Sequence, residues 1–263
     1  MYYFSMGYWV LGLALGVSLA GAVVGLACVR QSTMSRTAKF RLVWLTAAAV
    51  SLGGIGTWLA VFITMLGVGV PVGTIRYDVT SMVLAAVLAV ISVLGGLLIS
   101  GRGTDPARLA GGGVVMGLGL GLMHYLGMNA VGVQGSFEMN LASTAGATAI
   151  AVVVSLGVLW VTSRFRAMPI LVGAALVFAL AIIGLHYLGL AGVRVEVDPA
   201  VLQPPGEDLF GLFVPVFALG TLSLAIPITA ILVAPDRSRS ARPTVEMPSD
   251  TAPAPRRTPT PVG

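Results

Sequence analysis

Seven long apolar stretches, separated by short polar segments, dominate the pattern of this chain. A helix needs about 20 mainly apolar residues to cross roughly 30 Å of hydrocarbon, and lipid obliges the backbone to satisfy its own hydrogen bonds. The pattern therefore predicts an all-α membrane protein with seven transmembrane helices. The stretches, none of which contains a lysine or an arginine, are residues 8–29, 42–66, 79–100, 109–133, 144–163, 168–193 and 210–233.

The composition supports this assignment and bears on the partners. Hydrophobic residues make up 57% of the chain and charged residues only 10%, whereas soluble domains are about 25% charged. A net charge of +5 would suit a nucleic-acid partner, but the basic residues lie in short clusters between the apolar stretches. We therefore expect the lipid bilayer, and no nucleic acid, as a partner.

The clusters of basic residues predict the orientation. Thirteen of the 15 lysines and arginines lie in the first, third and fifth connecting segments and in the C-terminal segment, while Arg76 and Arg194 lie on the opposite side. The positive-inside rule places the basic side in the cytoplasm. With seven spans the N-terminus is then outside and the C-terminus cytoplasmic, as expected for a multi-pass membrane protein.

Residues 234–263 differ in composition from the rest. Proline is the commonest residue type in this segment, and most of the others are small or polar. Because such a segment has too few apolar residues to form a core, we predict a disordered cytoplasmic tail after a membrane domain of residues 1–233. We expect no further globular domain.

An internal repeat singles out candidate functional residues. The chain has two histidines, His124 and His186, and each begins the sequence His-Tyr-Leu-Gly, at 124–127 and at 186–189. The two histidines are 62 residues apart. A step of 63 residues back from His124 leads to Val61, and Met65 then corresponds to Met128. A repeat of this length covers two helices, so the pattern predicts three helix pairs plus one extra span.

The three equivalent positions fall on the second, fourth and sixth stretches, which run in the same direction under the predicted orientation. Each lies a few residues before the outer end of its stretch, or roughly 8–14 Å below the outer surface. The side chains are therefore expected to converge near the outer face.

The residue types at these positions favour a soft metal ion. Residues four apart share one face of a helix, which pairs His124 with Met128 and leaves Met65 beside the first copy. Thioethers suit Cu(I) and imidazole suits copper generally. His124, His186, Met128 and Met65 are neutral, so they would bury only the single charge of Cu(I). Met123, about 100° around the helix from His124, is a second-rank ligand or a lid.

Other interpretations remain open. Packing alone would also account for the histidines and methionines. Tyr125 and Tyr187 can donate hydrogen bonds either to the site or to lipid headgroups. Trp58 fits a role at the membrane interface or in packing. His124 and His186 could instead be the two axial ligands of a haem, or the chain could be a cofactor-free accessory subunit of a membrane complex. Without a catalytic triad or paired carboxylates in the spans, an enzyme is not expected.

The motif residues also carry a family resemblance over about residues 8–233. Met123-His124-Tyr125, with Met128 after it, resembles the Met-His-Tyr-Thr motif of the MHYT domain, and Tyr77-Asp78 after the first copy resembles the family pattern. The resemblance implies a seven-span, multi-pass sensor of the bacterial inner membrane with three motif copies near the outer face. It also implies copper bound by methionine and histidine, and a response to oxygen, carbon monoxide or nitric oxide.

This chain departs from that pattern at several motif positions. The first copy has Ala60 and Val61 in place of methionine and histidine, and leucines replace methionine or threonine at Leu126, Leu185, Leu188 and Leu190. The sequence as a whole predicts a membrane sensor and signalling module with a copper site near the outer face. We expect it to respond to a diatomic gas or to redox state and to act on an unidentified cytoplasmic protein partner.

Overall fold

A computed structural model describes residues 4–69, 75–198 and 200–233. The predicted disordered tail, 234–263, lies outside the described residues. Contacts divide the chain into two units, Met1–Leu232 and Val233–Gly263, and the first of these contains nearly all of the helical residues described below.

Seven helices in the described residues are long and apolar enough to cross a membrane, which confirms the predicted fold class. Six are continuous: α1 (Trp9–Met34), α4 (Val79–Ser100), α5 (Pro106–Asn129), α6 (Leu141–Arg164), α7 (Met168–Ala191) and α8 (Leu209–Val233). The remaining one, here called span two, is composite and consists of α2 (Ala38–Ala49), the π-helix η1 (Val50–Leu59), α3 (Ala60–Thr64) and the 3₁₀ turn η2 (Met65–Gly67).

Several helices extend beyond their apolar stretches because polar residues cap them. Asp105 accepts a hydrogen bond from the backbone N–H of Ala107, so α5 begins at Pro106 and takes in Arg108. At its other end α5 stops at Asn129, four residues before the predicted end. Residues 131–133 instead form a strand, so the helix predicted for about 109–133 starts three residues earlier and ends four residues earlier than the apolar stretch.

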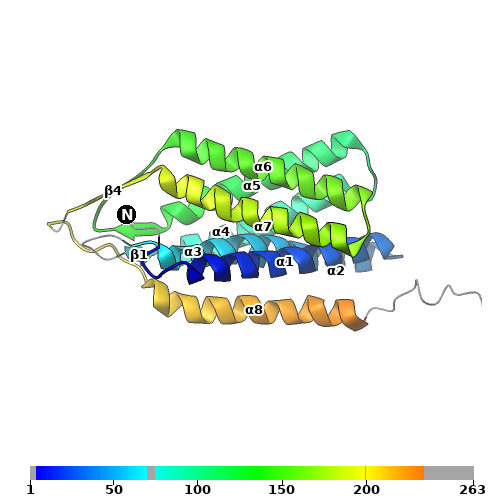
Figure 1. Ribbon diagram of the computed structural model, residues 1–263, viewed down its shortest axis with the longest axis horizontal. Helices are drawn as coiled ribbons and strands as arrows, with labels where there is room; N and C mark the ends of the chain where they lie inside the picture. Colours follow the sequence, from blue (N-terminus) through cyan, green and yellow to red (C-terminus); the bar gives the residue numbers. More distant parts are fainter. Residues whose placement is uncertain (1–3, 70–74, 199, 234–263) are drawn as a thin grey trace, which may run out of the picture. The chain divides into compact units, whose positions relative to one another are not determined.

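Within the described residues, four short strands, none of them predicted, join the connections at one end of the bundle. The strand β1 (Ile75–Tyr77) pairs antiparallel with β2 (Val131–Val133), and β3 (Gly135–Met139) pairs antiparallel with β4 (Val193–Val197). These strands lie at the ends where span two, α5 and α7 finish, which we call the motif end (Figure 1). The opposite end, which includes the α1–α2, α4–α5 and α6–α7 connections, is called the basic end.

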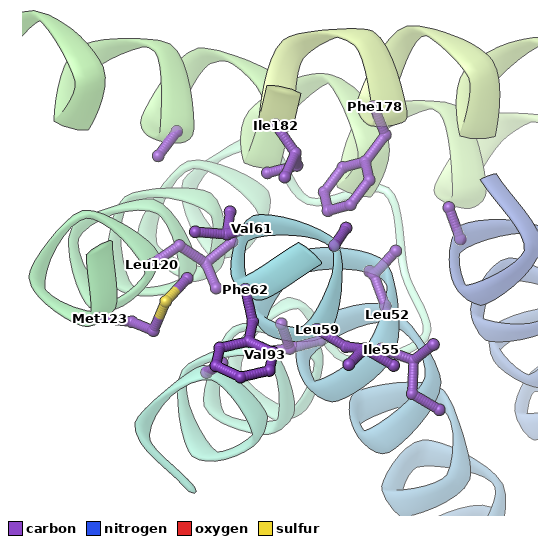
Figure 2. Close-up of a cluster of buried hydrophobic side chains, with 14 of the residues drawn as sticks. Leu52, Ile55, Leu59, Val61, Phe62, Val93, Leu120, Met123, Phe178 and Ile182 are labelled. Atoms are coloured by element: carbon purple, nitrogen blue, oxygen red, sulfur yellow. The ribbon is translucent and has the colours of Figure 1, made fainter. Parts of the chain in front are cut away.

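Span two is the central helix of the bundle. In the most apolar 18 residues of span two, 83% of the residues are buried, whereas in those of α8 only 11% are buried. Most of the surface of α8 is therefore left to lipid. Figure 2 shows Val61 and Phe62 of α3 among side chains of α5 and α7, including Met123 and Phe178. The first motif copy thus lies in the core, between the helices that carry the other two copies.

The π-helical part of span two has a wider turn, which other groups stabilise. The hydroxyl of Thr57 donates to the carbonyl of Leu52, five residues back, and Ser18 of α1 donates to the carbonyl of Gly56 at 2.6 Å. A Cβ at Gly21 of α1 would lie 2.5 Å from the Gly56 nitrogen, so glycine is required for this close approach. π-helical turns occur frequently beside functional sites, and this one ends directly before Ala60 and Val61.

Candidate metal site at the motif end

The two histidines come into contact between α5 and α7. Their ring centroids are 5.3 Å apart with the rings at 90°, the edge-to-face arrangement that aromatic rings prefer. His124 is 3% exposed and His186 is fully buried. His124 lies five residues before Asn129, the last residue of α5, and His186 lies five before Ala191, the last of α7. The equal depth inferred from the repeat therefore holds relative to the ends of these two helices.

The ring nitrogens of this pair are unusual because they have no hydrogen-bond partner. Nδ1 and Nε2 of both His124 and His186 are buried and unpaired within the described part of the chain. An unsatisfied buried polar group costs about 1–3 kcal/mol. Such groups in native proteins usually indicate an ion, a water molecule or a functional role. Four of them in one contact are consistent with a bound ligand.

A glycine permits the contact between the two helices. A Cβ at Gly189 of α7 would lie 2.2 Å from Nε2 of His124, which is closer than any non-bonded carbon–nitrogen contact. Gly189 is also the glycine of the third motif copy. The motif therefore supplies both a histidine and the space into which the histidine of the neighbouring copy fits.

On another side of His124 lies a small cavity rich in sulfur. Its volume is about 20 Å³, which is room for one water molecule or one ion. His124 and Val61 line it, together with four methionines: Met65, Met82, Met123 and Met128. All four methionines are buried. The predicted ligands Met65, Met123 and Met128 are thus gathered around one cavity, and Val61 lies where a third histidine would be.

Met82 is the residue that sequence reasoning missed. It lies in the first turn of α4, a helix that carries no motif copy, so the repeat does not reach it. The one available signal was its depth, since it lies four residues after Asp78, near the same end of the bundle as Met65 and Met128.

His186 has a different position from the one expected of a direct ligand. It contacts the ring of His124 but is not among the residues that line the cavity. His124 thus lies between the methionines on one side and His186 on the other. Among the described residues no three of the types His, Cys, Asp and Glu are grouped closely enough to hold a metal ion. The donors available are therefore imidazole and thioether.

The three residues predicted to support the site have different surroundings. Trp58 lines the cavity and stacks on Phe62 with ring centroids 5.6 Å apart. The ring of Tyr187 lies 5.8 Å from that of His186 and 5.6 Å from that of Phe4. Tyr125 is 44% exposed and does not line the cavity, so a membrane-facing role fits its position better than a supporting one.

Charged groups stay outside the cavity, at the ends of the helices. Asp78 caps α4 by accepting a hydrogen bond from the Ser81 N–H at 2.9 Å. The hydrogen bonds from Ser81 hold the pKa of the Asp78 carboxyl below its ordinary value. Burial raises the pKa of the neighbouring Tyr77, so this phenol stays neutral. The walls of the cavity are neutral, which suits a monovalent soft cation better than a divalent one.

The comparisons with known proteins bear on the same segments. Residues 54–113 and 117–175 match the MHYT family, described as a bacterial signalling protein N terminal repeat. The first match starts within span two, and the second ends within α7.

Two curated bacterial proteins are similar to this chain. One is the bifunctional diguanylate cyclase/cyclic di-GMP phosphodiesterase MucR of Pseudomonas aeruginosa, 33% identical over 58% of this chain and 23% of the relative. The other is an uncharacterized signaling protein of Caulobacter vibrioides, 26% identical over 73% of this chain and 23% of the relative. The chain thus spans less than a quarter of the length of these relatives, and no solved structure matches it. The two repeat matches and the seven membrane-spanning helices show that this chain carries the MHYT repeats of bacterial membrane signalling proteins.

Proposed function

We propose that this membrane signalling module holds one copper ion, as Cu(I), at the motif end and that the state of this site is the signal it senses. The observation that carries the proposal is the cavity of about 20 Å³ between His124 and four buried methionines. The ring nitrogens of the two histidines also support it, because they have no hydrogen-bond partner among the described residues.

The residues divide into ligands and a positioning residue. His124 supplies an imidazole nitrogen, and Met65, Met82 and Met128 supply thioethers from span two, α4 and α5. Met123 closes the cavity beside them. His186, whose ring contacts that of His124 edge to face but lies away from the cavity, positions the His124 ring by packing against it. Copper held by such ligands supplies a one-electron redox centre that can also bind oxygen, carbon monoxide or nitric oxide.

The geometry favours copper over a bis-His haem. A porphyrin between two axial histidines needs a wide slot with one imidazole on each face. Here the two rings meet edge to face, and the cavity beside them has the volume of about one ion. A haem would require α5 and α7 to separate.

The output is proposed to pass along the helices that carry the ligands. Span two, α4 and α5 each contribute to the cavity and continue to the basic end. A change of ligand or redox state would alter their relative positions and so the loops at that end. The relative from Pseudomonas aeruginosa is named for cyclic di-GMP synthesis and hydrolysis. We infer that the partner here is likewise a cytoplasmic signalling protein or domain.

The test is Cu(I) binding by the purified full chain in nanodiscs, in competition with a chromophoric chelator. We expect roughly one equivalent, with X-ray absorption showing sulfur and nitrogen neighbours. The variants His124→Leu and Met128→Leu should lose most of the binding. Met116→Leu is the matched control, because Met116 is fully buried on the same helix but does not line the cavity.

Two results would contradict the proposal. Copper content unchanged in both His124→Leu and Met128→Leu would show that these residues do not hold the ion, and no copper binding by the wild type would favour a cofactor-free accessory subunit. A strong haem absorption band in the wild type, lost in a His124 or His186 variant, would establish the bis-His haem.

A further inference from the structure

Four arginines from different segments gather at the basic end of the bundle. Arg102 in the α4–α5 connection and Arg166 after α6 line a cavity of about 30 Å³. Arg41 in the first turns of span two lies close enough to Arg102 and to Arg108 of α5 for their charges to repel it. The sequence suggested only that these residues orient the chain in the membrane. Arg102 and Arg166 thus line one cavity with the charges of Arg41 and Arg108 nearby, and this arrangement is a property of the fold.

Backbone carbonyls hold two of these guanidinium groups at the cavity. Arg102 donates from Nη2 to the carbonyl of Ser35, just after α1, at 3.0 Å. Arg166 donates from Nη1 to the carbonyl of Thr162, in the last turn of α6. A guanidinium has five N–H donors in a fixed plane. Each group is therefore oriented by one hydrogen bond while most of its donors stay available.

Arg108 is fixed in a similar way over the α4–α5 connection. Its Nε donates to the carbonyl of Ile99 at 2.9 Å. Gly101 has a φ of 73°, and a Cβ there would lie 3.0 Å from Nη2 of Arg108. The glycine thus provides both the backbone conformation of the turn and the space that the guanidinium occupies.

No carboxylate compensates this positive charge among the residues that the structure describes. The acidic residue of this connection, Asp105, uses its carboxylate to cap α5 by accepting from the Ala107 N–H at 3.0 Å. Nε and Nη2 of Arg41 are buried with no hydrogen-bond partner in the same part of the chain. Buried cationic donors without a partner are costly, and like charges in proximity add to that cost. An anion bound among the arginines would both pair the free donors and reduce the repulsion between the like charges.

The surroundings identify the kind of anion. Below the arginines the cavity has an apolar wall that includes Leu45, Leu97 and Leu109. Leu42 and Val43, which directly follow Arg41, are exposed on the surface of the bundle. In a membrane, acyl chains lie against this surface. A phosphate group matches the planar donor geometry of arginine. Basic pockets between membrane-spanning helices suit the headgroups of anionic lipids.

We propose that Arg41, Arg102 and Arg166 form a binding pocket for the phosphate of an anionic phospholipid, with the acyl chains lying along α2. Arg108 contributes to the positive potential around the pocket. This inference is independent of the copper proposal, because it concerns the opposite end of the bundle and no shared side chain.

The experiment compares the melting temperature of the purified full chain in detergent with phosphatidylglycerol, with phosphatidylcholine and with inorganic phosphate. Native mass spectrometry counts the lipids that remain bound. We expect phosphatidylglycerol to raise the melting temperature and phosphatidylcholine to have little effect. In Arg102→Gln/Arg166→Gln the apparent affinity for phosphatidylglycerol should fall about tenfold or more.

Arg164→Gln is the matched control, because Arg164 is two positions from Arg166 and does not line the cavity. Without lipid, the double variant should melt at or above the wild-type temperature, since the substitutions relieve charge repulsion. Stabilisation by inorganic phosphate alone, lost in the double variant, would support the phosphate pocket but assign it to a free anion. Equal stabilisation of the wild type and the double variant by phosphatidylglycerol would overturn the proposal, as would equal effects of the two lipids.

Discussion

The two ends of α4 and α5 border cavities of similar size and opposite chemistry. At the motif end, a cavity of about 20 Å³ has neutral walls that include an imidazole and four thioethers. At the basic end, a cavity of about 30 Å³ is bordered by two arginines and several hydroxyls over an apolar wall. His124 and Arg108 lie on the same helix, about 24 Å apart along its axis. Each cavity has the chemistry that its depth allows, because neutral soft donors can be buried cheaply and arginines need headgroups or water.

The comparison also suggests how the two ends communicate. Span two, α4 and α5 contribute residues to both cavities. A bundle whose helices are fixed at one end by a ligand and at the other by lipid headgroups can respond only by tilting or shifting these shared helices. The predictions below separate the ends, from the largest expected effect to the smallest.

Gly189→Ala should disrupt the motif end most strongly. The added methyl group would lie where Nε2 of His124 is, so the ring or α7 has to move. We expect a loss of about 1–3 kcal/mol of stability from overpacking and a fall in Cu(I) affinity of about 10–100-fold. Denaturant unfolding and chelator competition measure these quantities. Gly184→Ala on the same helix, where a Cβ meets nothing within 4 Å, should change neither. Wild-type copper affinity in Gly189→Ala would argue against the role of His124.

Val61→His restores the histidine that the first motif copy lacks. Val61 lines the cavity beside Met65, so an imidazole there can add a nitrogen donor. We expect Cu(I) affinity to rise about tenfold, which corresponds to about 1.4 kcal/mol. Val61→Leu, which adds volume without a donor, should lower the affinity or leave it unchanged. A rise in Val61→Leu as large as that in Val61→His would show that packing, and not ligation, controls the site.

Much of the fold was predictable because lipid imposes a simple rule on long apolar stretches. All seven predicted stretches are largely helical, and the stretch at 79–100 coincides with α4. The helix ends were less predictable, since caps such as Asp105 and short strands such as β2 decide them. Such short strands bury too little to leave a pattern. The orientation of the chain remains a prediction, because the fold itself does not depend on which side is cytoplasmic.

The candidate site was predictable only as far as the repeat extends. The repeat relates His124 to His186, and the structure brings these two rings into contact. It also led to Met65 and Met128, which line the cavity. Met82 could not be found in this way because it lies on a helix outside the repeated motif. The arginine pocket depends on which helices are neighbours at the basic end, which no local pattern records.

Ionic strength should separate the two ends by a smaller effect. Charges near an aqueous surface are screened within about 10 Å at 0.1 M salt. Binding of phosphatidylglycerol at the arginine pocket should therefore weaken severalfold between low and high sodium chloride. Cu(I) binding between neutral donors in the core should not change. Native mass spectrometry and chelator competition on the same preparation give the two curves. Lipid binding that does not depend on salt would show that acyl-chain packing, rather than the charge of the arginines, holds the lipid.

The smallest effect concerns the first turn of α4, which carries Met82 into the motif end. The carboxylate of Asp78 caps this helix by accepting from Ser81, and its pKa is lowered from an ordinary value of 3.8. A carboxyl whose pKa is depressed by folding stabilises the folded state above its unfolded pKa, and the contribution disappears as the pH falls through the folded pKa. The melting temperature of Asp78→Ala should therefore be slightly below that of the wild type near neutral pH. This difference should shrink as the solution is acidified below about pH 4.

Asp78→Asn keeps the side-chain acceptor without the titration, so its difference from Asp78→Ala should persist in acid. A difference between wild type and Asp78→Ala that grew on acidification would have the wrong sign for a capping carboxylate and would show that another group controls this end of α4.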